Sequence, residues 1–402
     1  MIFGLGKSLQ AWVSHLLKNP IEIIKIAILV LIILFSSYEK YKVFDKTGGD
    51  FATYKKASRE FLSGINPYDY TVRSYLEEGS TRRSDTTKPR ENDLSHGYAY
   101  LPGLLYIQAP LYKLSEIVDF PLQRLWSLPV LLADIGVSIL LIFALYKKSY
   151  LASLIAVAAW SYNPFFLINQ TYTNSEPYPV FFLLLALLML EKYEKLSAVF
   201  FATSVAFKTF PLMLLPIFLL KSKNILRFLL IGLSVFIVIS LPFMKSFEDF
   251  WTYIQGSLLV HGERELQGRP LLSYLQYYTG WQFFQVSYFK FYAFAALITG
   301  PILVFMKRKE NVHKHIQAML TLSCFYVLTP ILSRTHLIWF IPFYLLGMYE
   351  LTNPTSLSQS PKNDNKRLIL YTFVIILFYV LYALYLSQWG RGFRYIGDEI
   401  LL

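Results

Sequence analysis

Cysteine is almost absent from this 402-residue chain: Cys324 is its only one. The chain can therefore form no intrachain disulfide and no cysteine metal cluster. Charged residues are also scarce, at 16% of the sequence, whereas 55% of the residues are hydrophobic. That composition is too apolar for a soluble globule. Several apolar runs reach the roughly 20 residues that a helix needs to cross a bilayer core, and they do not alternate as β-barrel strands do. We therefore expect an all-α polytopic membrane protein.

Several sequence signals that would indicate other functions are missing. No glycine-rich loop follows a strand to cradle a nucleotide, and no soluble domain is large enough to bind a nucleotide sugar. The histidines show no zinc-ligand spacing except His313 and His315, which belong to a basic loop, so no metal site is predicted. The hydropathy shows neither a repeat nor an inverted symmetry, which argues against the commonest transporter architectures.

The net charge of +12 comes from short basic clusters between apolar runs rather than from one basic stripe. This pattern indicates membrane orientation by the positive-inside rule, and we expect no nucleic-acid partner. The first 20 residues carry Lys7 and Lys18 and no cleavable small-residue site, so the first span is expected to remain as an anchor.

Assigning the basic clusters to the cytoplasm predicts a single membrane domain, 1–402, of about eleven transmembrane helices. The segment 197–220 counts as two half-length spans that turn near Pro211. Two large loops, 38–122 and 244–284, are predicted to be external, and 351–367 is predicted to be a cytoplasmic loop. The other predicted spans are about 22–37, 124–145, 150–168, 177–190, 226–243, 286–305, 316–331, 336–350 and 368–386. The compact chain, without retention signals, favours a prokaryotic plasma membrane with the chemistry on the outer face.

The first external loop is predicted to contain interfacial helices. Phe51, Tyr54, Ala57, Ser58, Phe61 and Leu62 recur at three- and four-residue steps, with charged residues between them, as in an amphipathic helix. Asp50 would lie at its N-terminus, where the helix dipole favours an ionised carboxylate. The alternative is that Asp50 only caps the helix. A second interfacial helix is expected over Tyr98 to Leu114.

Ordered motifs along the chain resemble those of the GT-C glycosyltransferases, specifically the GT87 mannosyltransferase-like family and the PIG-M-type mannosyltransferases. The first is Asp50 to Tyr70, which ends in Gly64-x-Asn66-Pro67-Tyr68-Asp69, and the second is Tyr98-Ala99-Tyr100-Leu101-Pro102-Gly103-Leu104-Leu105. Further matches, which together cover most of residues 44–345, are Asp134, Asn163-Pro164, Ser175-Glu176, Phe207-Lys208-Thr209-Phe210-Pro211 and Ser333 to Pro342 with Trp339.

The resemblance implies a GT-C fold and an enzyme that takes a sugar from a polyprenyl phosphate, with an acidic residue of the first external loop as catalytic base. On this chain that residue is Asp50. The PIG-M-type enzymes carry Asp-x-Asp here, whereas this chain has Gly48, so the single-aspartate GT87 pattern fits better. No cofactor is assigned, and a divalent cation, Mg²⁺ or Mn²⁺, stays open.

Glycosyl transfer with inversion needs a base for the acceptor hydroxyl and cations for the departing phosphate. Asp50 supplies the base, and Lys208, Arg334 and His336, at predicted external span ends, are the candidate phosphate ligands. For Arg334 the alternative is interfacial snorkelling. The candidate substrate-binding residues are Glu176, Tyr98, Tyr100, Arg264 and Arg269. Glu176 has helix capping as its alternative, and the aromatic residues around Arg264 and Arg269 also suit an interfacial belt. Asp134, inside a span, is expected to pair with a Tyr, Ser or Lys of the bundle.

These observations predict a membrane hexosyltransferase that moves a hexose, mannose by resemblance, from a polyprenyl-phosphate donor to a lipid-linked or surface glycan acceptor. Membrane lipids are its other expected partners. Two alternatives remain open. One is a transporter or flippase of lipid-linked sugars, and the other is a non-catalytic partner of another glycosyltransferase.

Overall fold

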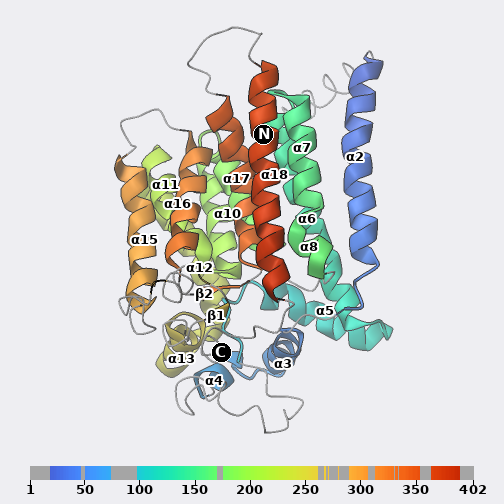
Figure 1. Ribbon diagram of the computed structural model, residues 1–402. Helices are drawn as coiled ribbons and strands as arrows, with labels where there is room; N and C mark the ends of the chain where they lie inside the picture. The colour runs from blue at the N-terminus through green and yellow to red at the C-terminus, as the bar shows by residue number, and fades with distance from the viewer. Residues whose placement is uncertain are drawn as a thin grey trace.

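The computed structural model describes residues 19–46, 50–73, 97–169, 175–260, 267–268, 270, 279, 289–306, 313–329, 331–333, 335–353 and 364–389. Within these ranges the chain is almost wholly helical, and the strands assigned there are two residues long. Most helices run side by side as a bundle, and shorter helices gather at one end of it (Figure 1).

Five helical segments of the described chain are long and apolar enough to cross a membrane. They are α2 (Pro20–Tyr41), α6 (Leu122–Leu145), Tyr150–Ile168, Ile225–Phe243 and Asn365–Ser387. The last three correspond to α7 (Tyr150–Ser161) with α8 (Pro164–Asn169), α12 (Ile225–Ser240) with η4 (Leu241–Phe243), and α18 (Asp364–Trp389). Helices of this length and composition are those of an all-α membrane protein.

Shorter helices fill the rest of the bundle. Three of these segments are apolar, namely α9 (Pro177–Met189), η3 (Phe210–Leu214) with α11 (Leu215–Lys221), and α17 (Leu337–Thr352). They pack with α10 (Glu194–Phe207), α15 (Phe289–Met306) and α16 (Lys314–Leu328). The outer helices expose their apolar side chains: Phe35 of α2, for example, is 62% exposed and Leu226 of α12 is 67% exposed. Such apolar outer surfaces suit contact with lipid.

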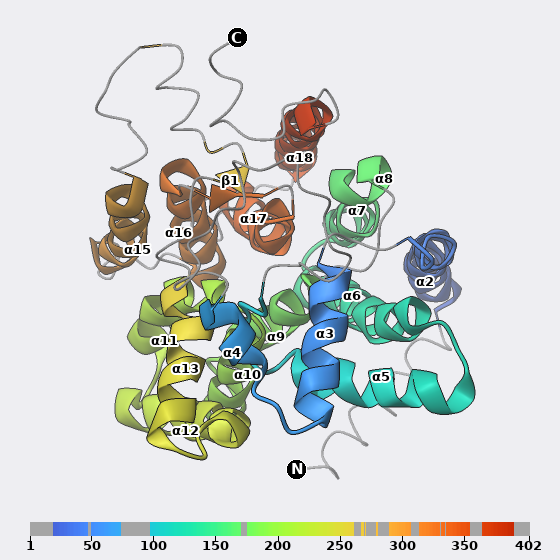
Figure 2. The same ribbon diagram turned by 90° about the horizontal axis from the view of Figure 1, so that it is seen from below.

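Several helices cover the end of the bundle that contains the first large loop. They are α3 (Phe51–Leu62), α4 (Pro67–Val72), α5 (Leu105–Val118) and α13 (Phe247–Ser257). Seen along the bundle, α3 and α5 lie across it rather than along it (Figure 2). In α3, Tyr54, Ala57 and Ser58 are buried while Lys55 and Arg59 are exposed, which confirms the predicted amphipathic helix.

The helix predicted over Tyr98 to Leu114 begins only at Leu105. The residues before it run against the end of α10, where the Gly103 amide donates to the Ala206 carbonyl at 2.9 Å. A Cβ on Gly103 would lie 2.7 Å from that carbonyl oxygen. This close approach of two backbones requires glycine.

Three other boundaries differ from the sequence prediction. The turn expected near Pro211 occurs at Lys208 and Thr209, between α10 and η3. The predicted span 150–168 breaks before Pro164, whose missing N–H favours a helix start, and the Asn163 side chain accepts from the Phe166 amide at 3.1 Å. Helix α18 begins at Asp364, inside the predicted cytoplasmic loop 351–367.

A short parallel pairing connects the second large loop to the start of α17. Strand β1 (Gln267–Gly268) pairs with β2 (Ile331–Leu332), with Gln267 opposite Ile331. The pairing brings a segment of loop 244–284 beside the residues that precede His336.

A buried ion pair joins α2 to α6. Lys40 Nζ lies 2.5 Å from Asp134 Oδ2, and the two side chains are only 1% and 7% exposed. The Lys40 ammonium also lies 5.5 Å from the ring centroid of Phe166. The prediction that Asp134 faces the bundle and pairs with a polar group is therefore confirmed.

Candidate functional site

The candidate site begins with the helical hairpin formed by α9 and α10. Glu176 precedes α9 and Lys208 follows α10, so both lie at the same end of the hairpin. Lys208 Nζ is 2.6 Å from Glu176 Oε1, and the side chains are 17% and 5% exposed. Trp339 of α17 donates its indole N–H to the other oxygen, Oε2. Glu176 occupies the N-cap position of α9 but makes no side-chain capping bond. It is instead the acceptor that holds Lys208 and Trp339 together.

Aromatic rings surround this ion pair. The Lys208 ammonium lies 4.9 Å from the centroid of Trp339 and 5.7 Å from that of Tyr100. Trp339 stacks with Phe210 at 4.2 Å and with His336 at 4.3 Å between ring centroids. Cations are attracted to ring faces at these distances, so the aromatic groups stabilise the charge on Lys208.

Asp50 joins the cluster through Tyr100. The Tyr100 hydroxyl donates to Asp50 Oδ2 at 2.6 Å, while the Tyr100 ring faces Lys208. Asp50 lies at the N-cap of α3 but makes no side-chain capping bond, and its side chain is half-buried. Its carboxylate is therefore held by a residue from another segment. The alternative that Asp50 only caps α3 lacks the hydrogen bond that defines such a cap.

Tyr54, one turn into α3, interacts with Asp50 and with Ser175 and Glu176, which precede α9. Burial raises the pKa of the Tyr54 hydroxyl well above its usual range, and the negative charge of Asp50 raises it further. Interactions with the Tyr100 and Ser175 side chains offset part of this rise in pKa. Tyr54 therefore stays protonated at neutral pH, with its hydroxyl beside the side chains of Tyr100 and Ser175.

Two other predicted residues have supporting contacts. Tyr98 is 2% exposed, donates to the Leu101 carbonyl at 3.1 Å, and packs against the rings of Tyr68 and Tyr100. It therefore holds the loop that carries Tyr100. His336 accepts from the Ser333 amide through Nδ1 at 3.3 Å, which fixes the imidazole beside Trp339.

The structure thus brings together Asp50, Tyr100, Glu176, Lys208 and His336. Arg264, Arg269 and Arg334 lie outside the described residues. The cluster also contains residues to which the sequence gave no role at the site, namely Tyr54, Phe210 and Trp339. A signal for Trp339 exists, because it follows His336 by three residues and so shares its helix face.

Metal binding would depend on the carboxylate and imidazole groups of the same residues. Within the described ranges, no group of three or more His, Cys, Asp or Glu side chains is arranged to hold a metal ion. Both oxygens of Glu176 accept hydrogen bonds from Lys208 and Trp339. The other described carboxylate at the site, Asp50, accepts from the neutral hydroxyl of Tyr100 and not from a cation.

Together, fold and site define an all-α protein with membrane-spanning helices and a polar, aromatic-walled site at one end of its bundle. No protein-family model matches the chain, and no curated protein matches it at a significant level. The site geometry and the sequence motifs are therefore the basis for the functional proposal.

Proposed function

We propose that this chain is a GT-C-type glycosyltransferase of about eleven transmembrane helices. It moves a hexose, mannose by resemblance, from a polyprenyl phosphate to a lipid-linked or surface glycan acceptor. In this proposal the reaction takes place at the outer face of a prokaryotic plasma membrane and inverts the anomeric centre. Asp50 is the general base.

The observation that carries the proposal is the placement of Asp50. Its carboxylate makes no capping bond in its own helix and accepts from the Tyr100 hydroxyl. Hydrogen bonding to the charged form, together with the N-terminal dipole of α3, favours an ionised carboxylate. A half-buried, ionised and oriented carboxylate is suited to take a proton from an acceptor hydroxyl.

The departing phosphate would be received by the cations of the site. Lys208 has three N–H donors, and Glu176 accepts at least one of them. Because Trp339 holds the other oxygen of Glu176, the ammonium has a fixed position beside Tyr100. His336 and, in the proposal, Arg334 complete the phosphate ligands. Arg334 can hold a phosphate bidentately, which Lys208 cannot.

One aromatic ring of the site fits a sugar substrate. Tyr100 is half-buried beside Asp50 and Lys208, and an apolar face next to polar groups suits a ring with both C–H and O–H edges. Phe210 and Trp339 are buried and stacked on each other, so their part is to support the ion pair of Lys208 and Glu176. Tyr98 supports Tyr100, and Arg264 and Arg269 remain proposed substrate contacts. Whether the reaction needs a divalent cation is tested in the assay below, by adding Mg²⁺ or Mn²⁺.

The test is transfer of radiolabelled sugar from synthetic polyprenyl-phosphate mannose or glucose to a membrane lipid extract, with and without Mg²⁺ or Mn²⁺. Purified wild type is compared with Asp50→Asn and with Asp69→Asn, a control that removes an exposed carboxylate on α4. Folding is matched by size-exclusion chromatography and thermal unfolding. Loss of a general base lowers the rate by about 10²–10⁴-fold. We expect that loss in Asp50→Asn alone.

Equal transfer by wild type and Asp50→Asn would remove Asp50 from the mechanism. If none of the proteins transfers sugar while a known glycosyltransferase does so in the same assay, the enzymatic proposal fails. Movement of lipid-linked sugar across vesicles containing the purified chain would then support the flippase alternative, and its co-purification with an active transferase would support the partner alternative.

A further inference from the structure

A second polar site lies at the opposite end of the bundle from Asp50. It is a cavity of about 350 Å³, lined by the ends of α6 and α9 with the residues that follow them, the end of α11, the start of α16 and the last turns of α17. Helix α17 connects the two sites: His336 precedes its first residue and Glu350 lies near its end. At 1.5 Å per residue the two positions are about 21 Å apart. The proposed transfer reaction makes no use of this cavity.

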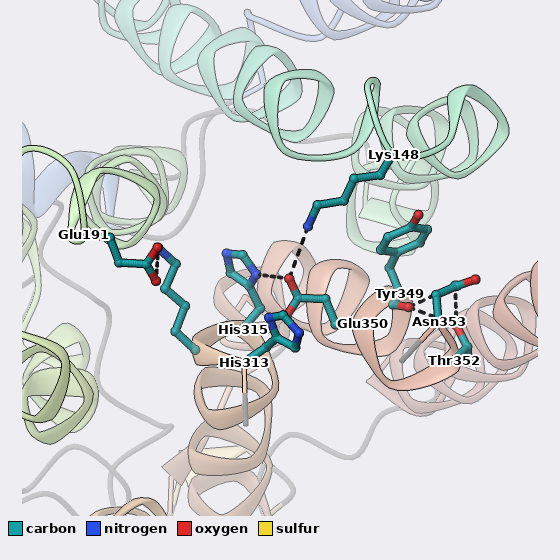
Figure 3. A network of polar contacts seen from close by, with 9 residues as sticks. Lys148, Glu191, His313, His315, Tyr349, Glu350, Thr352 and Asn353 are labelled. Atoms are coloured by element: carbon teal, nitrogen blue, oxygen red, sulfur yellow. Dashed lines mark hydrogen bonds and ion pairs between the residues drawn. The ribbon is translucent and has the colours of Figure 1, made fainter. Parts of the chain in front are cut away.

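Glu350 is the centre of the polar lining, as Figure 3 shows. Its Oε1 atom is 2.8 Å from His315 Nδ1 and 3.4 Å from Lys148 Nζ. Its Oε2 atom is 3.5 Å from His313 Nδ1. On the other side of the cavity, Lys314 pairs with Glu191 at 3.2 Å. Carboxylates thus hold lysines at the cavity wall.

His315 presents an unsatisfied polar atom. Only 6% of the residue is exposed, and its Nδ1 is bonded to Glu350. Because a carboxylate only accepts, Nδ1 carries a proton. The second nitrogen, Nε2, is buried and has no hydrogen-bond partner among the described residues. In Figure 3 the ring directs this nitrogen away from Glu350. Buried polar atoms in folded proteins are normally paired, so this position is open to a ligand.

The electrostatics of the cavity favour an anion. Its lining contains Lys148, Lys221 and Lys314 against Glu191 and Glu350, an excess of one positive charge with neutral histidines. The first turn of α16 adds the positive end of a helix dipole, and its N-cap residue, His313, makes no side-chain capping bond. Cations beside a helix N-terminus and a buried imidazole suit a ligand with anionic oxygens and a hydroxyl.

We propose that this cavity binds a phosphate group, with its oxygens on the lysines and a hydroxyl of the ligand on His315 Nε2. The group comes either from a phospholipid headgroup in the adjacent leaflet or from soluble phosphate. Both sources share this chemistry, and basic pockets between transmembrane helices are known to bind lipid headgroups.

The test uses the purified full chain and two probes. The first is inorganic phosphate, titrated in detergent against sodium chloride of equal ionic strength, with the thermal unfolding temperature as the signal. The second is nanodiscs of phosphatidylcholine with or without phosphatidylglycerol, followed by native mass spectrometry of retained lipid. The variants are Lys148→Gln and His315→Gln. Lys147→Gln is the matched control, because this adjacent exposed lysine is not part of the cavity lining.

We expect wild type and Lys147→Gln to bind at least one probe, and the two cavity variants to bind it about tenfold more weakly, as expected for the loss of one hydrogen bond to the ligand. A phosphate effect without phosphatidylglycerol retention assigns a soluble ligand, and the converse assigns a lipid. Binding of neither probe would overturn the proposal, as would an equal loss in Lys147→Gln. If His315→Gln fails to fold, Lys148→Gln decides, because its side chain is 49% exposed.

Discussion

The buried pair of Lys40 and Asp134 allows a sharp prediction about stability. Lys40→Met removes the cation and leaves the Asp134 carboxylate 7% exposed inside the bundle. At 2.5 Å, the lost attraction is roughly 7 kcal/mol for an effective dielectric constant of about 20. Relaxation and protonation of Asp134 reduce this cost, so we expect the free energy of unfolding to fall by about 3–5 kcal/mol.

The reference for this prediction is an exposed pair at the C-terminal end of the same helix, α2. Lys42 and Glu39 are also in contact, at 2.6 Å, but both side chains are 48% exposed. Lys42→Met should leave the stability unchanged within error, because solvent screens exposed ion pairs. The distances are similar, so the comparison isolates burial as the cause.

The assay is urea or sodium dodecyl sulfate unfolding in mixed micelles, followed by tryptophan fluorescence. The double variant Lys40→Met with Asp134→Leu should recover most of the loss, because replacing a whole buried pair by apolar groups is often neutral or stabilising. If Lys40→Met costs no more than Lys42→Met, or if the double variant is less stable than either single variant, the reasoning is wrong.

Three further predictions concern other parts of the molecule. Gly103→Ala should destabilise the protein by about 1–3 kcal/mol in the same assay, because its Cβ would meet the Ala206 carbonyl at 2.7 Å, whereas Gly232→Ala, with 3.9 Å of space, should not. Tyr100→Phe should slow sugar transfer about tenfold at unchanged folding, because Asp50 loses a hydroxyl donor. Arg124 holds Asp45 with two N–H donors, at 2.6 and 2.7 Å, a bidentate geometry that the exposed pair of Lys42 and Glu39 lacks. The side-chain hydrogen bond from Arg124 lowers the pKa of Asp45, so Asp45→Asn should reduce stability slightly at neutral pH. That difference should disappear as the pH falls through the folded-state pKa of Asp45, which the unfolding assay measures across an acid series.

The local features of the sequence predicted local structure well. The periodicity of residues 51–62 predicted α3, because an interfacial helix must separate its apolar and charged faces. The predicted start of α5 was wrong by seven residues. Residues 98–104 are not helical, because their backbone packs closely against the end of α10. That contact joins residues about a hundred positions apart, and no local pattern reports it.

The pairing of Lys208 with Glu176 was missed for a different reason. Each charge was considered alone, as a phosphate ligand or as a substrate ligand and cap. Yet both residues lie sixteen positions from Lys192, in the turn that joins α9 to α10. In an antiparallel hairpin, positions equidistant from the turn lie at the same level. The pairing of Lys208 with Glu176 could therefore have been predicted from the sequence. The contribution of Trp339 could not, because it depends on how α17 packs against α9.

The pairing of Lys208 with Glu176 also affects how the proposed polyprenyl-phosphate sugar would be bound. Helices α9 and α10 have 13 and 14 residues, so each spans about 20 Å, less than a bilayer core of about 30 Å. In the proposed arrangement of about eleven spans, the charged residues at the ends of these short helices would lie within the bilayer core, where a charge is tolerated only when it is paired within the protein. Lys208 and Glu176 neutralise each other, so together they add no net charge against a phosphate. The proposal therefore relies on Arg334 for charge compensation, while Lys208 supplies a fixed N–H group between Tyr100 and Trp339 that can hydrogen-bond to the phosphate.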